Sequence, residues 1–199
     1  MHNKATSPSE IESETAKPMR IDAMRNHEKI LKAAEEIFAL EGVMVPIDIV
    51  AERAGVGIGT LYRHFPTKEA LYEAIVMTRL SELLTLADEY AQNPDAGVAL
   101  YSFLHEFAAQ ASEKRDLMEA LSQAGIDFKA QFSSLIEELM AKVDALRARA
   151  AQSGAIRSDV ATQDILSLIV GICHVAGQGS SDDADLERLI NIVVAGIQP

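Results

Sequence analysis

The sequence predicts an all-α protein, and three observations support this fold class. Apolar residues recur at intervals of three and four along most of the chain, which is the spacing of one helix face. Glycine and proline residues separate these segments at places where helices end or begin. No segment alternates apolar and polar residues with β-branched enrichment, so no sheet is expected.

Composition limits the class of protein further. The 199 residues suffice for one large domain or two small ones, and 48% hydrophobic against 24% charged residues is a globular balance. A single cysteine rules out an intrachain disulfide and favours a reducing compartment. No apolar run reaches the roughly 18 residues of a membrane span, and the acidic N-terminus does not resemble a signal peptide. We therefore expect a cytoplasmic protein without a membrane partner.

The N-terminal part of the chain predicts a tail followed by four short helices. Residues 1–19 are polar and predict a disordered tail. A first helix is predicted over 27–41 and ends at Gly42. Short helices follow over 46–54 and 57–65, and a fourth begins at the cap residue Thr67 and runs to 77.

Longer helices are predicted in the rest of the chain. Their expected ranges are 80–91, 97–111, 117–124, 127–152, 161–176 and 183–197. The chain is therefore predicted to consist of the tail, a head at 20–77 and a body at 78–199.

The acidic charge is distributed unevenly along the chain. The net charge is -12, and residues 80–199, with 8 basic and 18 acidic residues, account for -10 of it. By contrast, residues 53–68 contain no Asp or Glu. The body is thus acidic, while this window in the head favours a polyanionic partner.

The acid-free window overlaps a predicted helix-turn-helix at residues 47–65. Gly55 supplies the left-handed residue of a sharp turn, and Val56 fills the space between the two helices. Leu61 and Phe65, four residues apart, are expected to anchor the second helix to the core. In this motif the second helix enters the major groove of DNA.

The residues expected on the free face of that second helix suit DNA. Glycines let the backbone approach closely, Thr60 offers a hydroxyl and a methyl to base edges, and the polar side chains can donate to phosphates. The candidate DNA-binding residues are Gly57, Ile58, Gly59, Thr60, Tyr62, Arg63, His64 and Lys68. The alternative is an ordinary helical hairpin with a solvated basic face. The tail could also reach a minor groove through Arg20 and Arg25, although passive disorder is the simpler interpretation.

Residues 27–76, from HEKILKAAEEIF to FPTKEALYEAI, resemble the DNA-binding domain of the TetR family of bacterial regulators. The most specific part is AGVGIGTLYRHFPTKEAL, and the later run GAIRSDVATQDILSLIVGIC is similar to the C-terminal domain of one subgroup. The resemblance implies a three-helix head, a helical effector and dimerisation body, and repression relieved by a small ligand. It also implies phosphate contacts by Tyr62, His64 and Lys68 and groove contacts around 57–60.

The sequence departs from the family pattern at the starts of two helices. Val45 and Pro46 stand where many members have Thr, so a cap hydroxyl is missing before the second helix. Gly57 stands where many members have Ser, and Gly is a tolerable N-cap. Ile58 replaces a commonly polar residue, and it can either meet a thymine methyl or pack inward.

The body is expected to hold an effector pocket and a dimer interface. The acidic body disfavours an anionic effector and favours an apolar or a cationic one, and of these an apolar small molecule that releases DNA is the expected effector. The candidate pocket residues are Phe103, His105, Phe107, Met118, Phe128, Phe132, Met140 and His174. A two-fold homodimer on a palindromic DNA site is expected from apolar stripes on the last two helices. The candidate interface residues are Ile165, Ile169, Ile172, Leu186, Leu189, Ile190, Val193, Val194 and Ile197.

Two other classes of protein are alternatives, a helical enzyme and an adaptor that does not bind DNA. His105 and Glu106 begin a zinc-protease pattern, but Ala109 stands at the position of the second histidine. Cys173 and His174 are adjacent on a helix, so their side chains point about 100° apart and do not readily share a metal. The chain has neither a phosphate loop nor a dinucleotide fingerprint. We expect no catalytic residue, metal or cofactor.

Overall fold

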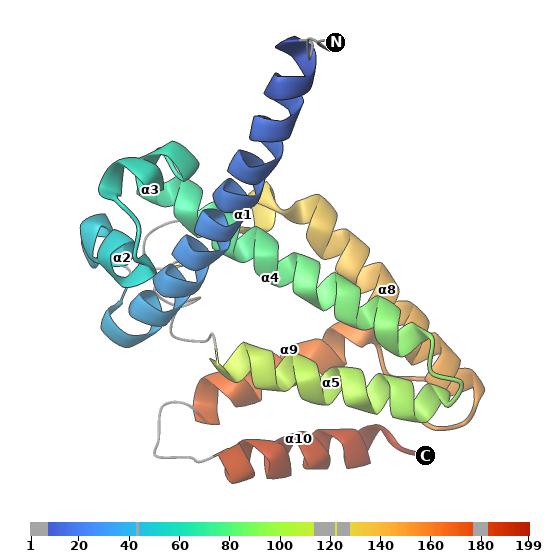
Figure 1. The fold of residues 1–199 in the computed structure, drawn as a ribbon. Coiled ribbons are helices and arrows are strands. Elements are labelled where there is room, and N and C mark those ends of the chain that lie inside the picture. Colours follow the sequence, from blue (N-terminus) through green and yellow to red (C-terminus); the bar gives the residue numbers. More distant parts are fainter. Residues whose placement is uncertain (1–7, 43, 114–121, 123–127, 177–182) are drawn as a thin grey trace, which may run out of the picture. The chain divides into compact units, whose positions relative to one another are not determined.

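The computed structural model describes residues 8–42, 44–113, 122, 128–176 and 183–199. The regular secondary structure of these residues is α-helical, which confirms the predicted fold class (Figure 1). Within these ranges, no helix is long and apolar enough to cross a bilayer. The chain divides into two compact units, residues 1–75 and 76–199. The boundary expected between the head and the body, after residue 77, lies two residues later.

The N-terminal unit contains α1 (Pro8–Glu41), α2 (Ile47–Ala54), α3 (Ile58–His64) and the beginning of α4 (Lys68–Ala91). Helix α2 packs on α1, and α3 packs on α2. Apolar side chains at helical spacing on α1 are buried, with Ile30 and Ala34 fully inaccessible and Phe38 1% exposed. Thr67 caps α4 as expected, since the backbone N–H of Ala70 donates to its hydroxyl at 3.1 Å.

Helix α1 begins much earlier than the sequence indicated. The structure continues it back to Pro8, where a disordered tail was expected, rather than starting it near His27. Glu, Ala and Met in this stretch are good helix formers, and Pro8 lies in the first turn, where its missing N–H costs nothing. Pro18 removes one backbone hydrogen bond from the interior of the helix, so the N-terminal turns are its weakest part.

The C-terminal unit contains the rest of α4 and five further helices. These are α5 (Ala96–Glu113), α7 (Phe128–Gln131), α8 (Ser133–Gln152), α9 (Thr162–Ala176) and α10 (Asp183–Ile197). Helix α5 packs against α8, α9 and α10, and α9 packs against α10 (Figure 1). Leu100, Phe103 and Leu104 of α5 are fully buried at the centre of this core.

Three helix predictions differ from the structure in this part of the chain. The segments 67–77 and 80–91 form one continuous helix, α4, because no glycine or proline lies between them to end it. The segment 127–152 is interrupted at Phe132, whose backbone (φ -110°, ψ 21°) leaves the helical region between α7 and α8. The predicted helix 117–124 lies almost entirely outside the described residues.

Candidate nucleic-acid interface

The turn between α2 and α3 has the geometry that the sequence predicted. Gly55 ends α2 in the left-handed region, at φ 66° and ψ 33°. The N–H groups of Gly55 and Val56 donate to the carbonyls of Glu52 and Ala51, both at 3.0 Å. The carbonyl of Gly57 then accepts from Thr60 and Leu61 and so starts α3. Backbone hydrogen bonds therefore fix the angle at which α3 leaves α2.

Helix α3 buries one face and exposes the other. Leu61 is fully buried and Phe65 is 2% exposed, so both anchor the helix as predicted. On the opposite face Tyr62 is 48% exposed, Ile58 is 44% exposed, and Arg63 is exposed as well. Ile58 therefore does not pack inward, which leaves it available to a ligand outside the chain.

Neither glycine at the start of α3 is required by the packing of the free protein. A Cβ atom added to Gly57 or Gly59 would meet no heavy atom within 4 Å. Both residues are exposed, and neither has a positive φ. The absence of side chains thus leaves open space over the first turn of α3, where another molecule can approach the backbone closely.

Neither α2 nor α3 has a side-chain N-cap, which confirms the loss of the cap hydroxyl before α2. Pro46 and Gly57 occupy the cap positions. Because the first-turn N–H groups of α3 receive no side-chain oxygen, they can donate to an anion such as a phosphate.

Lys68 is held within the N-terminal unit and is not a solvated surface charge. Its ammonium donates to the backbone carbonyl of Val45 at 2.7 Å and lies 5.9 Å from the ring centroids of Phe38 and Tyr72. Burial lowers the pKa of Lys68 from its usual value, although the nearby Glu69 partly opposes this. The ammonium has three donors, so a bond to a phosphate remains possible beside the bond to Val45.

Two histidines meet beside the end of α3. The His27 and His64 rings lie 5.8 Å apart in an edge-to-face arrangement, and the His27 ring packs at 4.8 Å on Phe65. Burial lowers the pKa of His27, the charge of His64 lowers it further, and Glu28 partly opposes both effects. His27 was absent from the sequence candidates because its partner comes from a distant part of the chain.

One cation of the acid-free window is neutralised by a residue outside it. Arg53 of α2 forms an ion pair with Glu36 of α1 at 3.0 Å, and both side chains remain partly exposed. The window is therefore less basic in three dimensions than its sequence suggests. The positive charge close to the exposed face of α3 comes from Arg63 and Lys68.

The structure does not gather the candidate pocket residues of the C-terminal unit around one cavity. Phe103 is fully buried in the core and stacks at 6.2 Å on Phe107, which lines a cavity of about 180 Å³ with apolar residues of α4. His105 lines a different cavity, of about 550 Å³, between α5 and α10. Phe132 is buried, Met140 packs against the core, and His174 is exposed. Met118 and the side chain of Phe128 lie outside the described residues.

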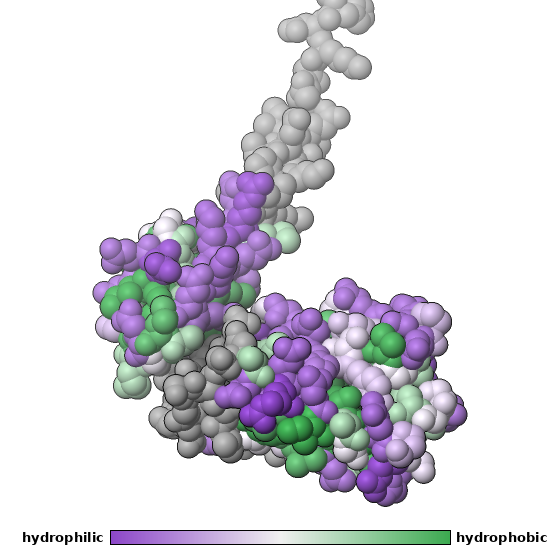
Figure 2. All heavy atoms as spheres, turned by 90° about the horizontal axis from the view of Figure 1, so that it is seen from below, coloured by the Kyte–Doolittle hydropathy of each residue, from purple (hydrophilic) through white to green (hydrophobic). Residues whose placement is uncertain are grey.

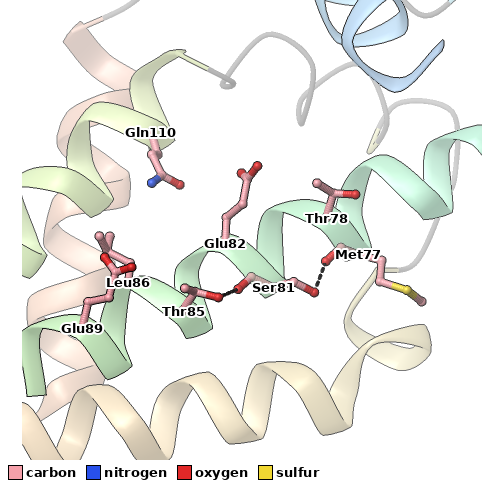
Figure 3. A pocket seen from close by; sticks show the side chains of 8 residues that line it. All are labelled: Met77, Thr78, Ser81, Glu82, Thr85, Leu86, Glu89 and Gln110. Atoms are coloured by element: carbon pink, nitrogen blue, oxygen red, sulfur yellow. Dashed lines mark hydrogen bonds between the residues drawn. The ribbon is translucent and has the colours of Figure 1, made fainter. Parts of the chain in front are cut away.

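A third cavity, of about 550 Å³ and wide open to solvent, lies along α4 and was missed by sequence reasoning (Figure 3). Polar residues at helical spacing indicated a polar face along this helix. The sequence predicted two separate helices, 67–77 and 80–91, so the continuous face was not recognised. Its lining residues are Met77, Thr78, Ser81, Glu82, Thr85, Leu86, Glu89 and Gln110.

Most of the predicted interface residues on α9 and α10 serve the core of their own chain. Five of the nine are buried in the monomer, namely Ile165, Ile169, Ile190, Val194 and Ile197. Ile172 and Leu186 pack partly against the same core, while Leu189 and Val193 are half-buried. The apolar side chains that these helices expose are Leu168 at 56%, Val170 at 50% and Ile192 at 58%. Most of the positions predicted for the interface are therefore occupied by the chain's own core, because both faces of α9 are apolar.

Comparison with known proteins agrees with this architecture. Residues 30–75 match the family described as bacterial regulatory proteins, tetR family, and residues 95–199 match the C-terminal domain of SbtR-like transcriptional regulators. The second match alone covers more than half of the chain. The protein belongs to the TetR family.

Solved structures of TetR-family regulators are similar over nearly the whole chain. A TetR regulator from Streptomyces coelicolor is 31% identical, with a TM-score of 0.72, over 87% of this chain and 98% of that one. A second, from Mycobacterium vanbaalenii, is 32% identical with a TM-score of 0.73, over 92% and 100%. An HTH-type transcriptional regulator of Staphylococcus aureus is 27% identical over 126 residues, covering 61% of this chain and 66% of the relative, slightly under two thirds of its length.

Membership of the TetR family assigns a function to each of the two units. The N-terminal unit is a helix-turn-helix DNA-binding domain, and the C-terminal unit is a ligand-binding domain of a transcriptional regulator. This family is a class of regulators and not a class of enzymes.

Proposed function

We propose that the protein is a cytoplasmic repressor that binds a palindromic DNA operator as a homodimer through the exposed face of α3. The observation that supports this most directly is the open first turn of α3. Gly57 and Gly59 present bare backbone there, and a Cβ atom at either would touch nothing in the free protein. Ile58 and Tyr62 flank this opening and are 44% and 48% exposed.

The residues around this opening divide into two roles. Thr60 and Ile58 face the major groove, where a hydroxyl can reach a base edge and an aliphatic group can contact a thymine methyl. Tyr62, His64 and Lys68 donate to phosphates and so fix the register of the helix on the duplex. Arg63 adds an exposed positive charge to this surface.

A homodimer would bring two copies of α3 to the two halves of a palindrome. We place its interface on α9 and α10, which expose Leu168, Val170 and Ile192. Figure 2 views the molecule from the side on which α10 lies in Figure 1, and it shows hydrophobic side chains at the surface of the C-terminal unit. Burying them against a partner helix would form a four-helix bundle.

Release from DNA would follow from binding of a small molecule in the C-terminal unit. Helix α4 belongs to both units, so a ligand that contacts it can influence the DNA-binding unit. The ligand must bind the DNA-free conformation more tightly than the DNA-bound one. A reduction of operator affinity by about a hundredfold requires about 2.7 kcal/mol of differential binding, within the usual range of coupling energies.

The Tyr62→Ala variant tests the assignment of the DNA-binding face. A DNA site is first selected with the purified protein from random duplexes, and its affinity is then measured for both proteins at several salt concentrations. The variant should bind at least about tenfold more weakly and keep its thermal stability, because Tyr62 is exposed. Binding by both proteins should weaken with salt, since Tyr62 is uncharged and the cations Arg63 and Lys68 remain in the variant. Equal affinity of the two proteins would show that α3 does not bind DNA through this face.

A further inference from the structure

The cavity along α4 differs from its neighbours in its hydrogen-bonding chemistry. Figure 3 shows Gln110 of α5 pointing over α4 toward the space between Glu82 and Leu86. The side-chain oxygen Oε1 of Gln110 is buried and accepts no hydrogen bond from the described residues. A buried acceptor without a donor costs free energy, so this atom favours a ligand that supplies one.

Two hydroxyl groups of the cavity also present acceptors. The hydroxyl of Ser81 donates to the Met77 carbonyl and that of Thr85 to the Ser81 carbonyl, both at 2.9 Å (Figure 3). Because each hydroxyl has a single hydrogen, these side chains can offer only lone pairs to the cavity.

The nearby cation does not supply the missing donors. The guanidinium of Arg79 donates to the backbone carbonyl of Gln110 at 3.1 Å and lies 3.8 Å from the carboxylate of Glu82. Its side chain is 12% exposed, so these contacts hold it in the wall of the adjoining cavity. The carboxylate of Glu89 forms no ion pair with any residue in the described ranges. After Arg79 offsets one of the two carboxylates, the cavity retains negative charge.

An apolar compartment adjoins this polar cavity. Gln110 lines both, and the second compartment, of about 180 Å³, is otherwise formed mainly by hydrophobic side chains. Its aliphatic and aromatic lining residues are Val76, Leu80, Leu83, Phe107 and Ala111. A ligand that fits both compartments therefore has an apolar part joined to a group that donates hydrogen bonds.

We infer that the effector of this regulator is an amphipathic organic cation, an ammonium or amidinium bound to an apolar group. A turn of the Gln110 side chain opens Oε1, which is closed to solvent in the unliganded protein, to the N–H donors of the ligand. The charge of the ligand lies between Glu82 and Glu89, and its apolar part enters the compartment beside Phe107. The inference rests on the proposed function in that it names the effector of the ligand-binding unit. Of the apolar and cationic effectors that the acidic body favours, it selects one that combines both properties.

Three matched probes distinguish this inference from a merely hydrophobic cavity. They are 2-naphthylmethylammonium, the neutral 2-naphthylmethanol and the anion 2-naphthoate, which share one ring system and differ in charge and donors. Binding to the full-length protein without DNA is measured by calorimetry. The ammonium should bind at least about tenfold more tightly than the alcohol, and the carboxylate more weakly than both. Equal or tighter binding of the carboxylate, or no saturable binding of the ammonium, would overturn the inference.

Two substitutions locate the site. Glu89→Gln and Gln110→Leu should each weaken ammonium binding by about tenfold, the value of one charge-assisted hydrogen bond. The control Glu106→Gln removes the same charge from an exposed position that does not line this cavity. Unchanged affinity in both variants, or an equal loss in the control, would contradict the location of the site.

The melting temperature of the unliganded Gln110→Leu variant distinguishes a ligand-binding role of Gln110 from a structural one. Since Oε1 has no partner, leucine should raise the melting temperature by about 2 °C. A lower melting temperature would show that the oxygen is satisfied in the folded protein. Operator binding of the unliganded wild type, measured in parallel, tests the proposed function separately. A protein that binds the ammonium at Gln110 but no DNA would refute that function and leave the cation site standing.

Discussion

The ammonium of Lys68 donates a 2.7 Å hydrogen bond to the backbone carbonyl of Val45, which joins the first turn of α4 to the segment just before α2. This bond therefore links the segment that follows α3 to the segment that precedes α2. Lys68, which forms it, also belongs to the proposed DNA surface. A partly buried, charge-assisted bond of this kind contributes more than an exposed ion pair. Lys68 therefore has a structural role beside its expected contact with phosphate.

The first prediction follows from this double role. Lys68→Met should lower the free energy of unfolding by about 1–2 kcal/mol, because the Val45 carbonyl loses its charged donor, and should weaken DNA binding as well. Arg63→Met, at an exposed position nearby, should weaken DNA binding alone. Urea unfolding and DNA titrations of both variants provide the comparison. Identical unfolding midpoints for Lys68→Met and the wild type would exclude the structural role.

The second prediction concerns the pH dependence of folding through His27. Its pKa is below the usual 6.5 in the folded protein, chiefly because of burial and also because of His64. Between the two pKa values the unfolded chain binds a proton that the folded chain does not, so stability decreases as the pH falls through 6.5. His27→Gln should remove this contribution and flatten the decrease.

Urea unfolding at about pH 7.5 and pH 5.5 measures the effect of His27. The variant also loses the ring contact with Phe65, which lowers its stability at both pH values, so the difference between the two values is the relevant quantity. Titrating groups that do not interact with His27, unlike His64 and Glu28, contribute equally to both proteins. If the difference in stability between the two pH values is the same in the variant and the wild type, folding does not change the pKa of His27.

The third prediction tests the dimer interface. Leu168→Glu combined with Ile192→Glu should convert the dimer to a monomer, because each change places a charge on an exposed apolar surface of α9 or α10. Light scattering after gel filtration gives the mass directly. The control Val98→Glu alters a residue of α5 that is 47% exposed, and the dimer should persist. A wild-type monomer at micromolar concentration, or a dimer in the double variant, would contradict the scheme.

The sequence predicted best what depends on neighbours along the chain. Gly55 and the pair Leu61 and Phe65 follow local rules of helix termination and helical spacing, and the structure confirms all three. The partner of Lys68 could not be predicted, since Val45 lies 23 residues away and contributes a backbone carbonyl.

The C-terminal unit shows where periodicity is ambiguous. Helix α9 is apolar on two sides, and the pattern cannot tell whether Ile169 or Val170 faces the chain's own core. The structure buries Ile169 completely and leaves Val170 50% exposed. The polar cavity was missed for a related reason, since it requires the side chain of Gln110 from α5 to lie over α4. Such a contact depends on how the helices pack.

The Gly59→Ala substitution tests the central claim, that DNA occupies the open space over the first turn of α3. A Cβ atom at this position meets nothing within 4 Å in the free protein, and alanine favours a helix over glycine by about 0.5–1 kcal/mol. The quantity to measure is the affinity of Gly59→Ala for the selected DNA site, with its urea unfolding recorded alongside. Affinity should fall at least about tenfold while stability is unchanged or higher. Unchanged affinity in a folded variant would contradict the central claim.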